Sequence, residues 1–71
     1  MRDPIIRAHI RQWRQNKNAI EGKCYGDTRQ IYFDGEDIIL LSIENVREGS
    51  DFFLFDCENS VYRADKSEEI V

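Results

Sequence analysis

The sequence predicts one α+β domain over residues 1–71, with an N-terminal amphipathic helix packed on a four- to five-stranded antiparallel meander. Two observations carry this prediction. Apolar residues recur at helical spacing before residue 19 and at strand-like spacing after it. Turn residues then divide the second part into short segments, and short connections favour antiparallel neighbours. Closure of the strands into a small, partly closed barrel is the alternative architecture.

The first segment has the signals of a helix start and of one apolar face. Asp3 can accept hydrogen bonds from free first-turn amides, and Pro4 sacrifices no hydrogen bond at the first helical position. At 100° per residue, one broad face collects Ile5, Ile6, His9, Ile10 and Trp13. Polar residues and Gly22 after this stretch predict that the helix ends near residue 17 or 18.

From residue 19 onward we expect strands at 19–25, 29–34, 37–44, 51–57 and 60–64. Asp34-Gly35 is the clearest hairpin signal between them, and residues 65–71 fray or add an edge strand. The pattern places six apolar side chains in one core: Ile6, Ile10, Trp13, Leu41, Ile43 and Phe53.

The expected strands 37–44 and 51–57 are apolar on both faces, whereas a sheet with one solvated face alternates apolar and polar residues. One short helix covers only one face. Ile38, Leu40, Phe52 and Leu54 would then form an exposed apolar patch. These four residues are the expected interface of a homo-oligomer, most simply a symmetric dimer.

The net charge of -4 is unevenly distributed. Residues 1–23 carry six Lys/Arg against two acidic residues, whereas residues 24–71 carry four against twelve. On the expected helix, Arg7, Arg11 and Arg14 gather on one flank, where like charges repel. These arginines are the candidate partner-binding residues, for an acidic protein or for phosphates. A solvated or internally compensated face is the structural alternative.

Other candidate residues have simpler structural interpretations. The acidic run 34–37 does not match a calcium loop and is typical of a solvated turn. His9 is expected to pack between Ile5 and Trp13. Cys24 and Cys57 form no zinc motif, so two reduced thiols are expected, with a disulfide possible only if their strands are neighbours. We therefore expect no catalytic residue, no metal site and no cofactor, and the protein is not expected to be an enzyme.

The leading functional hypothesis is a small, non-enzymatic protein-interaction or regulatory module that self-associates through an apolar sheet face. One alternative is a nucleic-acid-binding regulator that uses the basic helix face. Another is an acidic inhibitor that mimics nucleic acid. No stretch approaches the roughly 18 apolar residues of a membrane span, and the N-terminus lacks a signal-peptide pattern. A cytoplasmic location with no membrane association is expected.

Overall fold

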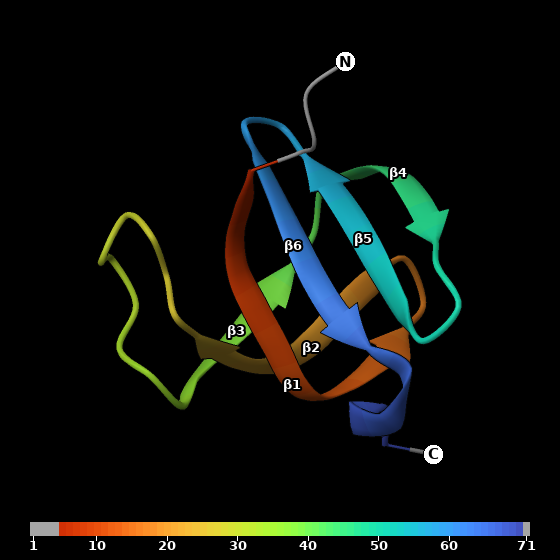
Figure 1. Cartoon of the computed structure of the whole chain (residues 1–71), viewed down its shortest axis with the longest axis horizontal. Coiled ribbons are helices and arrows are strands. Elements are labelled where there is room, and N and C mark those ends of the chain that lie inside the picture. The colour runs from red at the N-terminus through yellow and green to blue at the C-terminus, as the bar shows by residue number, and fades with distance from the viewer. Residues whose placement is uncertain (1–4, 71) are drawn as a thin grey trace.

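A computed structural model describes residues 5–70, and the chain there forms one curved β-sheet (Figure 1). Its elements, in chain order, are β1 (Ile6–Asn16), β2 (Ala19–Tyr25), β3 (Glu36–Leu40), β4 (Ile43–Glu48), β5 (Phe52–Cys57), β6 (Ser60–Asp65) and the 3-10 turn η1 (Lys66–Glu68). Within these described residues the 3-10 turn is the only helical element. The expected helix start at Asp3 and Pro4 lies outside them.

The strand order is β3-β2-β1-β6-β5-β4. Strands β1, β2 and β3 pair antiparallel, and so do β4, β5 and β6. The two halves join through β1 and β6, which run parallel. The sheet is therefore mixed, and the expected antiparallel meander is wrong at this central pairing.

The expected N-terminal helix, and with it the α+β class, is also wrong. In β1 the side chains of Ala8 and Ile10 point to the core at strand spacing. Gln12 then adopts a φ of 49°, and the register with β2 shifts, so an extra residue is accommodated. This β-bulge turns Trp13 to the core as well. The resulting spacing of the buried residues Ile10 and Trp13 is also that of one helix face. Ile6, which we expected in the core, is only half-buried.

Gly22 on β2 permits this bulge. It lies between the paired positions Glu21 and Lys23, opposite the shifted part of β1. A Cβ on Gly22 would lie 2.5 Å from Cγ2 of Ile10 and 2.9 Å from Cβ of Trp13. A glycine is needed here because the two backbones approach too closely for a side chain.

The curvature of the sheet follows from its shortest connection. Strands β3 and β4 stand at opposite edges, yet only Leu41 and Ser42 link them. Five strand spacings in a flat sheet would separate these edges by about 24 Å. Three Cα–Cα steps span at most about 11 Å. The sheet must therefore curl until the two edges come close.

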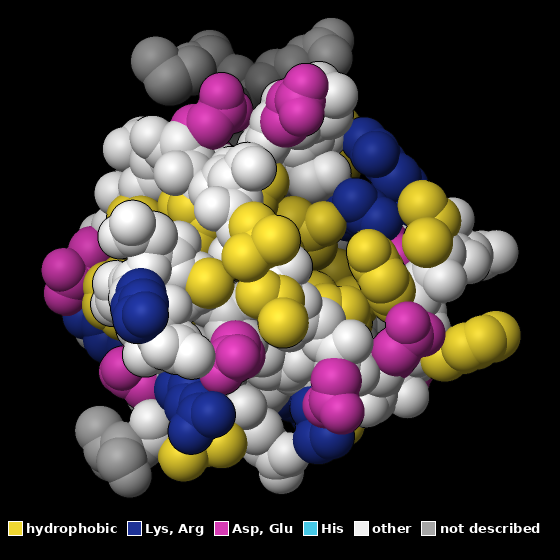
Figure 2. Space-filling view, turned by 180° about the vertical axis from the view of Figure 1, so that it is seen from behind, with side chains coloured by type: hydrophobic (Ala, Val, Ile, Leu, Met, Phe, Trp, Pro, Cys, Tyr) yellow, Lys and Arg dark blue, Asp and Glu magenta, His cyan; other side chains and the backbone are white. Residues whose placement is uncertain are grey.

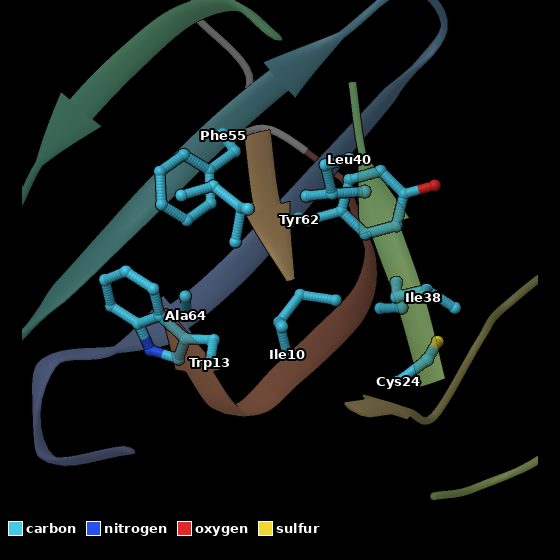
Figure 3. Close-up of a cluster of buried hydrophobic side chains, with 10 residues drawn as sticks. Ile10, Trp13, Cys24, Ile38, Leu40, Phe55, Tyr62 and Ala64 are labelled. Atoms are coloured by element: carbon cyan, nitrogen blue, oxygen red, sulfur yellow. The ribbon is translucent and has the colours of Figure 1, made fainter. Parts of the chain in front are cut away.

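The concave side of the curled sheet contains the core. In Figure 3, Ile10 lies centrally, with Trp13 and Phe55 to one side and Tyr62, Leu40 and Ile38 to the other. The complete set of buried hydrophobic residues is Ala8, Ile10, Trp13, Ile20, Cys24, Ile38, Leu40, Phe55, Tyr62 and Ala64. Ile43 and Phe53 pack against this core, whereas Leu41, which we expected inside it, is exposed.

Two other expected strands differ in the structure. The range 29–34 belongs to a non-strand connection between β2 and β3, and Asp34-Gly35 ends that connection instead of forming a two-residue hairpin. The range 37–44 divides at Leu41 and Ser42 into β3 and the start of β4. The other three expected strands match β2, β5 and β6.

The C-terminal segment returns to the bulged part of β1. After the 3-10 turn, Glu69 forms an isolated bridge with Trp13, and the amide of Ile70 donates to the Trp13 carbonyl at 2.7 Å. Across the described part of the chain, we find no helix with the length and apolar character to cross a membrane.

Candidate functional site

The opening between the unpaired edges of β3 and β4 is the main surface feature of the fold. Each strand pairs on one side only among residues 5–70. Two hollows of about 470 and 280 Å³ adjoin the opening, and both include Leu41 and Ser42 in their walls. Figure 2 shows hydrophobic side chains gathered near the centre of this side of the molecule, with charged side chains around them.

The larger hollow, which we call the apolar hollow, exposes part of the core. Its apolar lining consists of Trp13, Ile20, Leu41, Ile43, Val46, Phe53 and Phe55. The ring of Trp13 meets those of Phe53 and Phe55 edge-on at centroid distances of 5.8 and 5.7 Å. Its Nε1 donates to the carbonyl of Asp65 at 2.8 Å, so the indole nitrogen is already satisfied. The wall thus combines aromatic and aliphatic side chains with the polar residues Gln15, Asn18 and Ser42, and Glu69 is its one charged residue.

The edge strands β3 and β4 and the link between them carry exposed apolar side chains. Leu41 is 73% exposed, and Ile39 and Val46 are each at least half exposed. Leu41 and Val46 also line the hollow itself. Unpaired strand edges with hydrophobic side chains are templates for pairing with another chain. The sequence pattern could not identify these residues, because it places Leu41 in the core and leaves Val46 unassigned.

The smaller hollow is bordered by an ion pair with aromatic neighbours. The Nε of Arg7 donates to Oδ1 of Asp27 at 3.1 Å, and the Asp27 side chain is 0% exposed. The Arg7 guanidinium lies 5.6 Å from the ring centroids of both Tyr32 and Tyr62. The buried charges of Arg7 and Asp27 are thus paired with each other, as buried polar groups in proteins generally are.

Asp27 is ionised because of its hydrogen bonds. Burial alone would raise the pKa of its carboxyl. The hydrogen bond from Arg7 and those from the amides of Tyr32, Arg29 and Ile31 outweigh burial and hold the pKa well below its ordinary value. For Tyr62, burial raises the pKa of the phenol despite the nearby Arg7 charge. Arg7 and Asp27 therefore form a fixed ion pair beside the neutral phenol of Tyr62.

The three arginines that we expected to act together have different partners in the structure. Arg7 is committed to Asp27, and Arg14 pairs with Glu21 at 3.1 Å on the surface. The guanidinium of Arg11 lies 5.0 Å from the ring centroid of Tyr25. Among residues 5–70, Arg11 alone of the three has no carboxylate within 4 Å. Their partner-binding role stays a prediction, and Arg7 has a separate structural role.

The four residues expected at an oligomer interface also separate. Ile38 and Leu40 lie in the core, whereas Phe52 and Leu54 are half-buried. Phe52 is covered by the Arg63 guanidinium at 4.3 Å from its ring centroid. A charge placed at Leu40 would therefore test folding more than association. The interface itself stays a prediction.

Two side chains of the acidic run 34–37 accept hydrogen bonds from nearby backbone amides. Oδ1 of Asp34 accepts from the Gly26 amide at 2.8 Å, and Oε1 of Glu36 accepts from the Phe33 amide at 3.1 Å. Asp37 pairs with Lys23 at 2.9 Å. Between residues 5 and 70 the chain forms no group of three or more His, Cys, Asp or Glu that could hold a metal ion.

His9 and the cysteines also have defined places. His9 is exposed on β1, not packed on an apolar face as we expected. Cys24 and Cys57 are free thiols on β2 and β5, which are not neighbouring strands. Burial raises the pKa of both thiols, so neither is activated as a nucleophile.

No family model, curated protein or solved structure matches this chain.

Proposed function

We propose that this protein is a non-enzymatic interaction module that receives an extended segment of a partner protein at the opening between β3 and β4. One observation carries the proposal: the edge strand β4 and the Leu41–Ser42 link to the other edge strand, β3, line a hollow of about 470 Å³ that also exposes aromatic rings of the core. An added strand would satisfy edge backbone groups, and alternate side chains would enter the hollow. Burial of apolar surface would contribute about 25 cal/mol per Å² before the costs of association.

The chemistry of the lining favours a particular occupant. Leu41 and Val46 offer exposed apolar surface, and Glu69 supplies a carboxylate with no basic partner within 4 Å among residues 5–70. The whole chain carries a net charge of -4. A segment that alternates apolar residues with Lys or Arg matches both properties.

A displayed library of twelve-residue random peptides tests the proposal. Selected peptides should alternate apolar and basic residues, and Leu41→Asp and Val46→Asp should each weaken their binding by about tenfold or more. Ile5→Asp is the matched control, because Ile5 is 82% exposed and lines neither hollow. Amide hydrogen exchange in β3 or β4 should slow when a peptide is bound.

Two results would overturn the proposal. One is a selection in which no peptide binds more weakly to Leu41→Asp or Val46→Asp than to the wild type. The other is tight binding with no slowing of exchange in either edge strand, which would exclude strand addition.

Self-association is the second candidate for the same surface, because a second copy can also supply a strand edge and exposed Ile39 and Leu41. Light scattering at micromolar concentration tests it. A monomer mass would remove this candidate. A dimer that Leu41→Asp dissociates would support it, and the exposure of Leu41 makes that substitution safe for the fold.

A further inference from the structure

The connection between β2 and β3, residues 26–35, is the longest between strands in the described chain. It carries two large hydrophobic side chains that have little contact with the protein. Phe33 is 84% exposed, and Ile31 is 61% exposed. At the edge of the molecule formed by this loop, on the right in Figure 2, hydrophobic side chains project beside acidic ones.

The loop is held in place by many hydrogen bonds. The buried Asp27 carboxylate accepts from three amides of the loop, those of Arg29, Ile31 and Tyr32, at 3.0–3.1 Å. The Gly35 amide donates to the Cys24 carbonyl at 2.8 Å, and the Thr28 amide donates to the Arg7 carbonyl at 2.8 Å. Both ends of the loop are thereby tied to the sheet.

The amide of Phe33 is itself held by Glu36, at 3.1 Å. The fold thus fixes the backbone on both sides of a side chain that stays in solvent. A contact residue fixed in advance loses little backbone entropy on binding, and aromatic residues dominate binding energy at interfaces. Phe33 has both properties.

A hollow of about 410 Å³ lies beside Phe33, lined by Gly26, Asp27, Gln30, Tyr32, Phe33 and Asp34. It combines two aromatic rings with a carboxylate at the surface. Asp34 uses Oδ1 to hold the Gly26 amide and has no Lys or Arg within 4 Å among residues 5–70. Tyr32 already has one cation, Arg7, at 5.6 Å from its ring centroid.

We propose that this loop is a second, preorganised docking site, which binds a Lys or Arg side chain of a partner protein next to an apolar contact on Phe33. Aromatic faces and carboxylates are the groups that recognise such cations. The loop hollow shares no lining residue with the apolar hollow. Tyr32 also lines the smaller hollow beside the β3–β4 opening, but Phe33 and Asp34 line neither hollow there.

Charge favours a basic protein segment at this loop over two other possible occupants, a second copy of the chain and an anionic membrane surface. The apolar hollow of a second copy presents Glu69, which would repel the carboxylates of Asp34 in the loop and of Glu36 directly after it. An anionic membrane surface would repel the same carboxylates. A basic protein segment is attracted by them.

Binding of displayed twelve-residue peptides, selected on the wild-type protein, tests the proposal. We expect one group of Arg- or Lys-containing peptides whose binding Phe33→Ser weakens by about tenfold or more and Asp34→Asn weakens by about threefold. Raising the salt concentration should weaken binding to the wild type. Leu41→Asp should leave these peptides unaffected, so failure at this site is distinguishable from failure at the β3–β4 opening.

Asp27→Asn gives an independent test of preorganisation, because it leaves Phe33 in place but removes an acceptor from the loop. Weaker binding with a native Trp13 fluorescence spectrum would support the proposal. A selection in which no peptide binds more weakly to Phe33→Ser or to Asp34→Asn would overturn it. Binding of wild type to vesicles of anionic lipid, lost in Phe33→Ser, would overturn it in favour of a membrane site.

Discussion

Arg7 and Asp27, which are 20 residues apart in the chain, form an ion pair at 3.1 Å with 13% and 0% of their side chains exposed. The pair connects the start of β1 to the loop between β2 and β3. Arg7 also donates to Oγ of Ser60 at 3.2 Å, at the start of β6. Three segments distant in sequence therefore meet at one guanidinium.

This ion pair predicts that substitutions of two arginines on β1 lower the melting temperature by unequal amounts. Arg7→Gln should lower the melting temperature by roughly 10 °C or more, because breaking a buried ion pair leaves a charge without its partner. Arg11→Gln should change it by less than about 4 °C, because Arg11 lies over Tyr25 at the surface. Thermal unfolding followed by circular dichroism measures both. Equal losses of melting temperature in the two variants would contradict a stabilising role of the Arg7–Asp27 pair.

The second prediction concerns pH. The pKa of Asp27 is lowered in the folded protein, so its ionised form stabilises the fold above the ordinary Asp pKa of about 3.9. That stability is lost as the pH falls below this value toward the folded pKa. The gap in melting temperature between wild type and Asp27→Asn should therefore narrow from pH 6.5 to pH 3. A gap that is constant across this range would contradict the assignment.

The third prediction uses two glycines. Gly22→Ala should destabilise the protein by about 1–3 kcal/mol, because the new Cβ would overlap Ile10 and Trp13. Gly26→Asn is the matched control. Gly26 has a φ of 64°, a Cβ added there would meet nothing within 4 Å, and Asn tolerates this conformation. Urea unfolding should show a change below about 0.5 kcal/mol for the control. A mild effect of Gly22→Ala would mean that the bulge can relax.

The fourth prediction concerns the aromatic wall of the apolar hollow. Trp13→Phe keeps an aromatic ring but removes the donor that bonds the Asp65 carbonyl at 2.8 Å. The loss should be at least about 1 kcal/mol in the free energy of unfolding. In the wild type, Trp13 emission should shift to longer wavelength on unfolding, since the residue is buried. An unchanged stability in Trp13→Phe would show that this hydrogen bond contributes nothing.

Part of the fold follows from local sequence signals. Short apolar runs and flanking turn residues predict β2, β5 and β6 within a residue or two of their observed bounds. Short loops at residues 49–51 and 58–59 join antiparallel neighbours, as their Gly, Ser and Asn residues indicate. These elements depend on turn chemistry and on strand periodicity, which are properties of neighbouring residues.

The tertiary structure alone decided the conformation of residues 6–16 and the position of the candidate sites. The spacing of Ile6, Ile10 and Trp13 fits both a helix and a bulged strand, and hydrogen bonding to β2 and β6 on both sides selects the strand. The exposure of Leu41 and the burial of Asp27 likewise depend on how the sheet curls. Contacts between residues far apart in sequence set these outcomes, and no local pattern encodes them.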